Sequence, residues 1–267
     1  MNYKLLAVDI DGTLLNSDGI LTQNTKESIH KAVERGVIFV ICTGRPIQGV
    51  TDLNEEIGLD LPYITYNGAM VVMGKSKEIL YERSLPKEQS RKIYRLGQHY
   101  DVTMVIWGNN QLYTNKINDH SIEYSGLTKT KCIEIQDLDD IPYDITKILW
   151  YEDHEELLTC QKELEGQIDN HINMHFSRPY FLEFVDAQAT KAIAIEKLCD
   201  YYGFGYNQTI AIGDGENDLS MIQSAGLGVA MSNAPEKIRR AAAFVTLSCD
   251  EDGVAHVIDK YIMEGNW

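Results

Sequence analysis

The stretch Leu6–Leu15, LAVDIDGTLL, passes from apolar residues into two acids one residue apart, followed by a glycine and a threonine. Because alternate side chains of an extended strand share a face, Asp9 and Asp11 are expected to project together where the strand ends. The carboxyl ends of strands in open α/β sheets are where ligands bind. Two neighbouring carboxylates repel, and a hard divalent cation such as Mg²⁺ would compensate that repulsion. The stretch therefore predicts a buried strand that leads into a metal site.

A turn or a helix cap without a bound ion is the alternative interpretation of two acids at this spacing. A calcium-binding loop can be tested against the sequence, and it fails. Counted from Asp9, the fifth and sixth positions hold Thr13 and Leu14, where such a loop requires an acid or asparagine and a glycine.

A second near-continuous apolar run, Val37–Thr43, is typical of a strand that is covered on both faces of a parallel sheet. Between the two runs, Asn24–Arg35 predicts a helix with a capping-box-like start at Asn24 and Glu27 and an end at Gly36. Strand, helix and strand together form a βαβ unit. Further core elements are expected at Ile64–Tyr66, Thr209–Asp214, Leu227–Ala230 and Phe244–Leu247 as strands, and at Asp218–Ala225 and Val254–Tyr261 as helices.

The middle of the chain, from about Arg83 to Val185, has the pattern of an inserted α+β unit. We therefore predict an α/β fold, with a doubly wound parallel-sheet core at residues 1–82 and 188–267 and a smaller inserted domain at residues 83–187. The elements expected in the insert are helices at Lys87–Tyr100 and His154–Ile168 and strands at Val102–Trp107, Gln111–Thr114, Cys132–Ile135, Ile145–Tyr151 and Phe181–Val185.

Charge and composition limit the partners of the chain. It has 24 basic and 40 acidic residues among 267, so its formal net charge is 24 − 40 = −16. This balance argues against nucleic acid or an anionic membrane as the main partner, and an anionic substrate would need local positive charge. Five widely spaced cysteines indicate neither a disulfide framework nor a zinc site. No apolar run near the N-terminus approaches the roughly 20 residues of a membrane span, and a cytoplasmic location is expected.

The second strand leads into Ile41-Cys-Thr-Gly-Arg-Pro46. The hydroxyl of Thr43 and the amide of Gly44 can both donate to a phosphate oxygen, and Arg45 can do the same or meet the substrate. The alternative is a strand-to-helix turn in which Thr43 caps the helix and Pro46 lies in its first turn. This stretch alone leaves both interpretations open.

A third stretch, Ala211–Leu219 (AIGDGENDL), again ends an apolar run in a glycine and acids. Asp214 would lie at the carboxyl end of a core strand, as Asp9 does, so the two could share one metal ion that Asp218 supports from the following turn. The alternative is an acid-rich start of a helix. Lys191, at the predicted start of another helix, would supply the positive charge that a phosphate needs beside these carboxylates.

Taken in order, D-x-D-G-T, T-G-R, K and G-D-x-x-N-D resemble the four motifs of the haloacid-dehalogenase (HAD) superfamily, and the resemblance spans the whole chain. The insert, with Tyr66–Ala69 before it and Pro179–Glu183 at its end, resembles the Cof-type, or IIB, branch and within it the YidA-like sugar-phosphate phosphatases. The chain departs from this pattern around the third motif. Ala192 stands where glycine is frequent, and Asp186–Ala189 differs from the usual sequence.

The resemblance implies a Rossmann-like HAD core with an inserted C2B-type cap domain that supplies specificity. It implies a Mg²⁺-dependent phosphatase that hydrolyses small phosphorylated metabolites, with sugar phosphates expected, through an aspartyl-phosphate intermediate. Asp9 would be the nucleophile, and Asp11 would protonate the leaving group and then activate water. Mg²⁺ would be bound by Asp9, the backbone carbonyl of Asp11 and Asp214, with Asp218 supporting that set.

The resemblance also implies which residues bind the substrate. The groups expected at the phosphoryl oxygens are amides near Ile10 and the residues Thr43, Gly44, Lys191 and Asn217. The candidate contacts to the rest of the substrate are Arg45, Asn67, Arg178 and Tyr180. For the last two, a solvated arginine and a packed tyrosine are the alternatives.

Two other functions stay open. A sugar phosphomutase of the same cap class shares these motifs but returns the phosphoryl group instead of releasing it. A non-catalytic sensor would bind phosphorylated ligands and is expected to lack Asp9 or Asp11, both of which are present. The expected partner is a small phosphorylated molecule, without nucleic acid or membrane, and the protein is expected to be a monomer or a weak homodimer.

Overall fold

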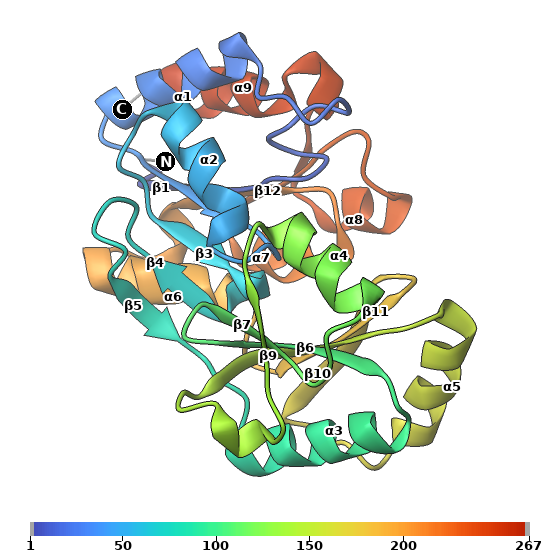
Figure 1. Ribbon diagram of the computed structural model, residues 1–267. Helices are drawn as coiled ribbons and strands as arrows, with labels where there is room; N and C mark the ends of the chain where they lie inside the picture. The colour runs from blue at the N-terminus through green and yellow to red at the C-terminus, as the bar shows by residue number, and fades with distance from the viewer. Residues whose placement is uncertain (1–2, 265–267) are drawn as a thin grey trace. The chain divides into compact units, whose positions relative to one another are not determined.

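The computed structural model describes residues 3–264, which form two compact units (Figure 1). The first unit contains the chain up to Gly44, Asp52–Tyr81 and the chain from Thr190 onward, and the second contains Arg45–Thr51 and Glu82–Ala189. Each unit has its own β-sheet. Among residues 3–264, no helix combines the length and the apolar character that crossing a membrane requires.

The first unit is built on an eight-stranded sheet with the order β14-β13-β12-β1-β2-β3-β4-β5. The pairs from β14 to β3 are parallel, and β4 runs antiparallel to β3. The strands are β1 (Leu5–Asp9), β2 (Ile38–Cys42), β3 (Tyr63–Thr65), β4 (Met70–Val72), β5 (Ile79–Glu82), β12 (Thr209–Gly213), β13 (Leu227–Ala230) and β14 (Phe244–Val245). The helices along these parts of the chain are α1 (Gln23–Glu34), α2 (Gln48–Ile57), α6 (Lys191–Tyr202), α7 (Leu219–Ser224), α8 (Glu236–Ala241) and α9 (Gly253–Ile258). The first turn of α2, residues 48–51, is grouped with the second unit.

Helices cover both faces of this sheet. Leu5 and Ala7 of β1 pack in one buried cluster with Ile195 of α6, whereas Leu6 and Val8, which point to the opposite face, are buried as well. On that opposite face α1 and α9 pack against each other (Figure 1). The predicted doubly wound α/β core is thus confirmed. The strand order reverses between β1 and β12, and ligands of such sheets bind at the carboxyl ends of the strands at this switch point.

The predicted start of helix α1 at Asn24 is wrong. The helix is capped by Thr22, whose side chain accepts a hydrogen bond from the N–H of Thr25. The side chain of Asn24 instead donates to Asp252 at 2.9 Å. The predicted capping box requires the side chain of Asn24 at the start of the helix, but that side chain binds the carboxylate of Asp252 instead.

The second unit has a six-stranded sheet with the order β10-β11-β9-β6-β7-β8. Its pairs are antiparallel except for β7 and β8, which are parallel. The strands are β6 (Thr103–Gly108), β7 (Gln111–Thr114), β8 (Cys132–Glu134), β9 (Ile145–Tyr151), β10 (Ile172–Arg178) and β11 (Phe181–Asp186). The helices are α3 (Lys87–His99), α4 (Asp119–Thr128) and α5 (His154–Leu164).

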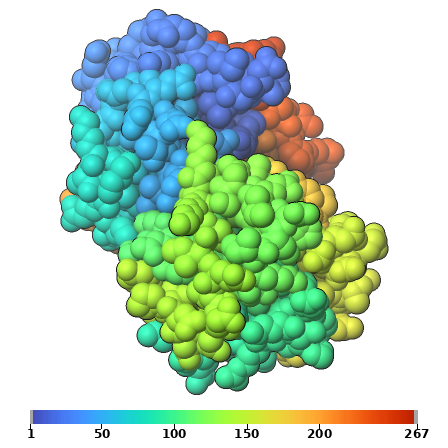
Figure 2. Space-filling view, in the orientation of Figure 1, coloured from blue at the N-terminus to red at the C-terminus, as the bar shows by residue number. Residues whose placement is uncertain are grey.

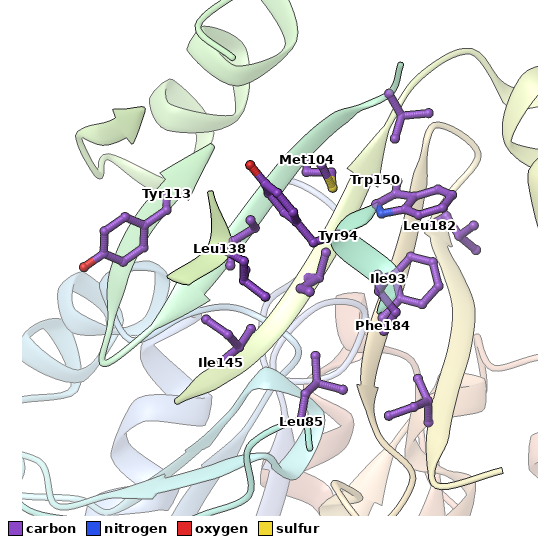
Figure 3. Packing of buried hydrophobic residues seen from close by; sticks show 14 of the residues in the cluster. Leu85, Ile93, Tyr94, Met104, Tyr113, Leu138, Ile145, Trp150, Leu182 and Phe184 are labelled. Carbon is purple, nitrogen blue, oxygen red and sulfur yellow. The ribbon is translucent and has the colours of Figure 1, made fainter. Parts of the chain in front are cut away.

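One face of this sheet forms the apolar core of the second unit (Figure 3). Met104 on β6, Trp150 on β9 and Leu182 on β11 point to this face and pack with Ile93 of α3 and Leu157 of α5. Burial of each such side chain contributes about 1.5–3 kcal/mol. The strands and helices predicted for the middle of the chain supply most of this cluster, and Ile172 is contributed by β10, which the sequence did not predict.

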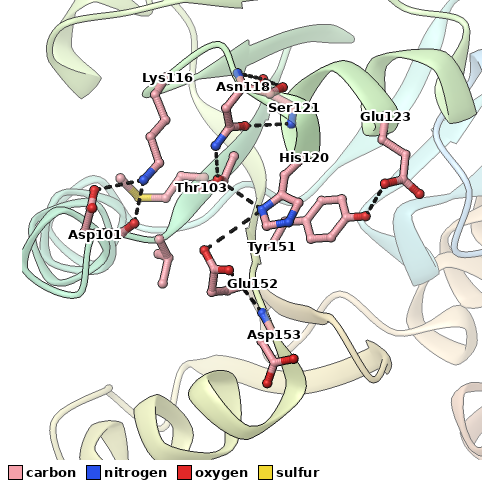
Figure 4. Close-up of polar contacts among 12 residues, drawn as sticks. Asp101, Thr103, Lys116, Asn118, His120, Ser121, Glu123, Tyr151, Glu152 and Asp153 are labelled. Atoms are coloured by element: carbon pink, nitrogen blue, oxygen red, sulfur yellow. Dashed lines mark hydrogen bonds and ion pairs between the residues drawn. The ribbon is translucent and has the colours of Figure 1, made fainter.

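Helix α4 covers the other face of the sheet and was not predicted. Its N-cap, Asn118, accepts from the N–H of Ser121 at 3.1 Å and donates to the hydroxyl of Thr103 at 2.8 Å (Figure 4). Ile122 and Leu127 are more than half exposed, so α4 lacks the single apolar stripe by which helices are predicted. The helix forms part of the molecular surface (Figure 2, green).

Candidate active site

Lys191 lies among the aspartates of the predicted site in the first unit. It opens helix α6, whose N-cap Thr190 accepts a hydrogen bond from the N–H of Ile193. The Lys191 side chain is fully buried, and its Nζ donates to Asp9 Oδ1 and to Asp218 Oδ1, each at 2.5 Å. Burial opposes the charge of Lys191, but Asp218 and Asp9 outweigh it and raise the pKa of the ammonium group. Lys191 is therefore held as a cation.

Three carboxylates meet around this lysine. Side-chain oxygens of Asp9, Asp214 and Asp218 lie within 4.8 Å of one another. Burial raises the pKa of Asp9 to about 8, with Lys191 lowering it and Asp218 raising it. Burial also raises the pKa of Asp214. With all four groups ionised, three negative charges and one positive charge leave a net of −2, which a divalent cation would neutralise.

This cluster fits Mg²⁺, because that ion takes carboxylate oxygens as ligands and keeps some of its water. The direction of Asp214 is set by Thr13, whose hydroxyl donates to Asp214 Oδ1 at 3.0 Å. At the neighbouring Gly12, a Cβ would lie 2.5 Å from Asp214 Oδ2. Glycine is therefore required beside the cluster, where its φ of +76° also turns the chain.

Asp218 shapes the loop in which it lies. Its Oδ2 accepts from the N–H of Asp214 at 3.1 Å and from the N–H of Gly215 at 2.9 Å, while its Oδ1 accepts from Lys191. The residue is fully buried. A carboxylate that binds two backbone amides and an ammonium group orders this loop, whereas support of a metal ion by Asp218 stays a prediction.

Asp11 differs from these three carboxylates. Strand β1 ends at Asp9, so the alternation of side chains stops before Asp11, which is exposed. Its carboxylate does not belong to the acidic cluster found among residues 3–264. The metal ligand predicted at Asp11 is its backbone carbonyl and not this carboxylate. Metal binding by that carbonyl and acid–base catalysis by the side chain both stay predictions.

The other predicted phosphate-binding residues lie in the segments that follow β1, β2 and β12. Thr43 is buried, its N–H donates to the carbonyl of Ile64 at 2.9 Å, and its own carbonyl accepts from the N–H of Asn67 at 3.0 Å. Asn217 Nδ2 donates to Asn67 Oδ1 at 3.0 Å. Ile10 is buried and its carbonyl accepts from the amides of the following turn. The structure thus links the second motif to the fourth through Asn67.

Three predicted substrate contacts lie in the second unit. The guanidinium of Arg45 donates to the carbonyl of Gly49 at 3.2 Å. Arg178 is exposed and donates to the hydroxyl of Tyr180 at 3.2 Å. The ring of Tyr180 stacks on Tyr151 with centroids 5.5 Å apart. Contact of these residues with a substrate stays a prediction.

Two residues of the site were missed from the sequence. Thr13 belongs to the first motif, and its hydroxyl orients Asp214. Asn233 donates from Nδ2 to the carbonyl of Gly12 at 2.8 Å and accepts from the N–H of Cys249 at 3.0 Å. The hydroxyl after D-x-D-G is a usable signal for Thr13. Nothing in the local sequence singles out Asn233.

Comparisons with protein families, curated proteins and solved structures all point to the same family. A family model described as haloacid dehalogenase-like hydrolase matches residues 6–258. YxeH of Bacillus subtilis (strain 168) is 34% identical, over 98% of this chain and 99% of YxeH. YitU of the same organism, named 5-amino-6-(5-phospho-D-ribitylamino)uracil phosphatase, is 28% identical over 96% of this chain and 97% of its own. A solved haloacid dehalogenase-like hydrolase from Bacteroides thetaiotaomicron has a TM-score of 0.87 and 34% identity, over 97% of this chain and 99% of its own.

Proposed function

Because the chain belongs to the haloacid dehalogenase-like hydrolase family and is a phosphatase of its Cof-type branch, we propose that it hydrolyses small phosphorylated metabolites in a Mg²⁺-dependent reaction. The observation that carries this proposal is the group formed by the buried Lys191 and three carboxylates at the carboxyl ends of β1 and β12. Such a group can place a cation and an ammonium beside a transferring phosphoryl group. Phosphoryl transfer depends mainly on that kind of positioning and charge neutralisation.

Asp9 is the proposed nucleophile. One of its carboxylate oxygens forms a bond to phosphorus while the ester P–O bond breaks, which gives an aspartyl-phosphate and a leaving alkoxide. Asp11 gives the alkoxide its proton. Asp11 then takes a proton from the water that attacks the aspartyl-phosphate, and inorganic phosphate leaves. The exposure of Asp11 supports this role, since a proton carrier must reach both the leaving group and water.

Asp9, Asp214 and the backbone carbonyl of Asp11 are the proposed Mg²⁺ ligands, with Asp218 holding their loop in place. When bound, the ion would offset the negative charge of these residues and of the phosphoryl oxygens. Lys191, Thr43, Gly44 and Asn217 are proposed to bind the same oxygens. Lys191 then exchanges one carboxylate partner for a phosphoryl oxygen.

Sugar phosphates are the proposed substrates, as the resemblance to the YidA-like phosphatases suggests, and residues 83–187 are proposed to be the cap domain that selects them. The relative YitU is named for a phosphorylated ribitylaminouracil, so that compound belongs in the same test. We propose a cytoplasmic protein without a nucleic-acid or membrane partner. The strongly negative charge of the chain supports the absence of such partners.

Phosphate release from a panel of sugar phosphates and the phosphorylated ribitylaminouracil, with Mg²⁺ and with EDTA, tests this function. We expect steady release that requires Mg²⁺. Asp9→Asn should reduce it more than about 1,000-fold and Asp11→Asn about 100-fold or more. Asp18→Asn, at an exposed acid of the following loop, is the matched control and should keep full activity. Transfer without release would favour the mutase, and binding without either reaction would favour the sensor.

A further inference from the structure

The turn that follows β3, Tyr66–Gly68, has an unusual backbone. Three successive residues have positive φ, with 51° at Tyr66, 56° at Asn67 and 105° at Gly68. Glycine adopts such angles freely and asparagine tolerates them, but for a bulky residue such as tyrosine they cost free energy. A backbone of this kind persists only where its surroundings hold it, and such turns are often found at functional sites.

The main chain of this turn contacts two segments of the candidate active site, the end of β2 and the start of α6. The N–H of Asn67 donates to the carbonyl of Thr43 at 3.0 Å. A Cβ at Gly68 would lie 2.2 Å from the carbonyl carbon of Thr190 and 2.7 Å from the amide nitrogen of Lys191. Only glycine therefore lets the turn approach the start of α6 so closely, and the turn spans from the end of β2 to the helix that carries Lys191.

The side chain of Asn67 reaches a third segment. Asn217 Nδ2 donates to Asn67 Oδ1 at 3.0 Å. A Cβ at Gly44 would lie 2.9 Å from that same oxygen, so the glycine leaves the space that the amide fills. A side-chain amide nitrogen carries two hydrogens. With one of them directed to Asn67, the Asn217 amide is oriented and keeps its second hydrogen for an anion.

From these contacts we infer that the side chain of Asn67 is a positioning group that holds the Asn217 amide in the arrangement that binds the phosphoryl oxygens. This role differs from the direct substrate contact that the family resemblance suggests for Asn67. The inference rests on the proposed function and deepens its account of the same site. A binding group displaced by about 1 Å can cost on the order of 100-fold in rate, so Asn67 affects catalysis without touching the substrate.

A double-mutant cycle distinguishes positioning from direct contact. Asn67→Gly removes the amide while accepting the left-handed backbone, and Asn217→Ala removes the group that Asn67 holds. We expect each single variant to lower kcat/KM for phosphate release about 10-fold. The double variant should be no slower than Asn217→Ala alone. If the two effects multiply to about 100-fold, Asn67 acts on the substrate independently of Asn217, and the inference is overturned.

Two control variants separate the amide from the backbone. Asn67→Ala removes the same amide but places a β-carbon in the left-handed region, so its Tm should fall below that of Asn67→Gly while kcat/KM agrees within about twofold. Asp101→Gly makes a glycine substitution at another left-handed position, with φ of 53° in the second unit, and should leave kcat/KM unchanged. An equal loss of activity in Asp101→Gly would mark the effect as unspecific and overturn the inference.

Failure of the proposed function can be distinguished from failure of this inference. If the wild type releases phosphate from no compound of the panel, the proposed function fails, and the contact is then tested by NMR of the side-chain amides. In Asn67→Gly the signals of the Asn217 amide should shift and exchange faster with water, because their hydrogen-bond acceptor is gone. Unchanged Asn217 signals would overturn the inference whatever the activity.

Discussion

Thr13 orients one of the three carboxylates of the candidate metal site. The residue is buried, and its hydroxyl donates to Asp214 Oδ1 at 3.0 Å. A neutral donor leaves the charge of Asp214 available to a cation while it fixes the direction of the carboxylate. Asn233 acts one step further away, since its amide holds the carbonyl of Gly12, the residue before Thr13. Within the acidic cluster, Asp214 is thus oriented by a neutral side chain, whereas Asp9 and Asp218 accept hydrogen bonds from the Lys191 ammonium group.

Thr13→Val keeps the shape of the side chain and removes its donor. Groups that orient metal ligands typically contribute 10- to 100-fold to metal affinity or activity, so we expect the Mg²⁺ concentration for half-maximal activity to rise about 10-fold or more. Thr13→Ser keeps the hydroxyl and should stay within about threefold of the wild type. Titration of phosphate release with Mg²⁺ measures both. The same Mg²⁺ dependence in Thr13→Val and wild type would show that the hydroxyl does not orient Asp214.

The charged residues of the site could be predicted because each stands within a short motif at the end of a strand or the start of a helix. Asp9 and Lys191, which are 182 positions apart, form the predicted group because their elements meet at the same edge of one sheet. The residues that orient them could not be predicted in this way. Asn233 and Gly12 are separated by 221 positions, and a single neutral amide in a loop carries no pattern of its own.

At the scale of elements, the start of helix α1 is held by the far end of the chain. Asp252 accepts hydrogen bonds from the hydroxyls of Thr22 and Thr25 and from the amide of Asn24. Burial opposes ionisation of Asp252, but these donors outweigh it and lower the pKa of the carboxyl group. A negative charge at this end also favours the helix dipole. Asp252 therefore joins α1 to α9, the two helices that share one face of the core sheet.

Asp252 has a left-handed backbone with φ of 57°, which allows its side chain and its backbone to be tested separately. Asp252→Gly removes the carboxylate without backbone strain, and we expect it to lower the free energy of unfolding by about 1–2 kcal/mol. Asp252→Asn keeps an acceptor oxygen and tolerates the same backbone, so its loss should be about half as large. Urea unfolding followed by circular dichroism measures both. An Asp252→Gly protein as stable as wild type would contradict this role.

Elements could be predicted from the sequence where their apolar residues form a continuous run or recur at the spacing of a helix. Strand β9 has the predicted bounds, Ile145–Tyr151, because its residues are buried on both faces. Helix α5 is shorter than predicted and ends at Leu164, although Ile168 still packs on the same core. Helix α4 and strand β10 were missed because their exposed and buried residues follow no clear period. The cap of α1 was misplaced because its partner, Asp252, is distant in sequence.

At the scale of the whole molecule, each unit contains a fully buried lysine, and the charges around them differ. Lys191 meets two carboxylates, with Asp214 nearby, so its surroundings keep excess negative charge that suits a cation and a phosphate. Lys147 on β9 pairs with Glu183 on β11 at 3.0 Å, and these two charges balance. A balanced buried pair has no charge left for a ligand. We therefore expect the Lys147–Glu183 pair to matter for stability.

The Lys147–Glu183 pair can be tested by removing one partner or both. Glu183→Gln leaves a buried lysine without its counter-charge, so we expect the free energy of unfolding to fall by about 3–5 kcal/mol. Lys147→Met with Glu183→Leu removes both charges and should be neutral or stabilising. Tryptophan fluorescence during urea unfolding follows this unit, which contains Trp107 and Trp150, if Trp267 is replaced by Phe. A double variant as unstable as Glu183→Gln would contradict the account.

The same pair predicts the direction of the pH dependence. Burial opposes ionisation of Glu183, but Lys147 and His175 outweigh it and lower its pKa below the usual 4.5. A carboxyl whose folded pKa is lowered stabilises the fold above its unfolded pKa and loses that effect as the pH falls through the folded pKa. His175, whose pKa burial lowers from 6.5, also disfavours the fold once protonated. The free energy of unfolding should therefore fall as the pH drops below 6.5, and further as it drops below 4.5. The fall should be less steep in the double variant, and equal slopes would exclude the pair as the cause.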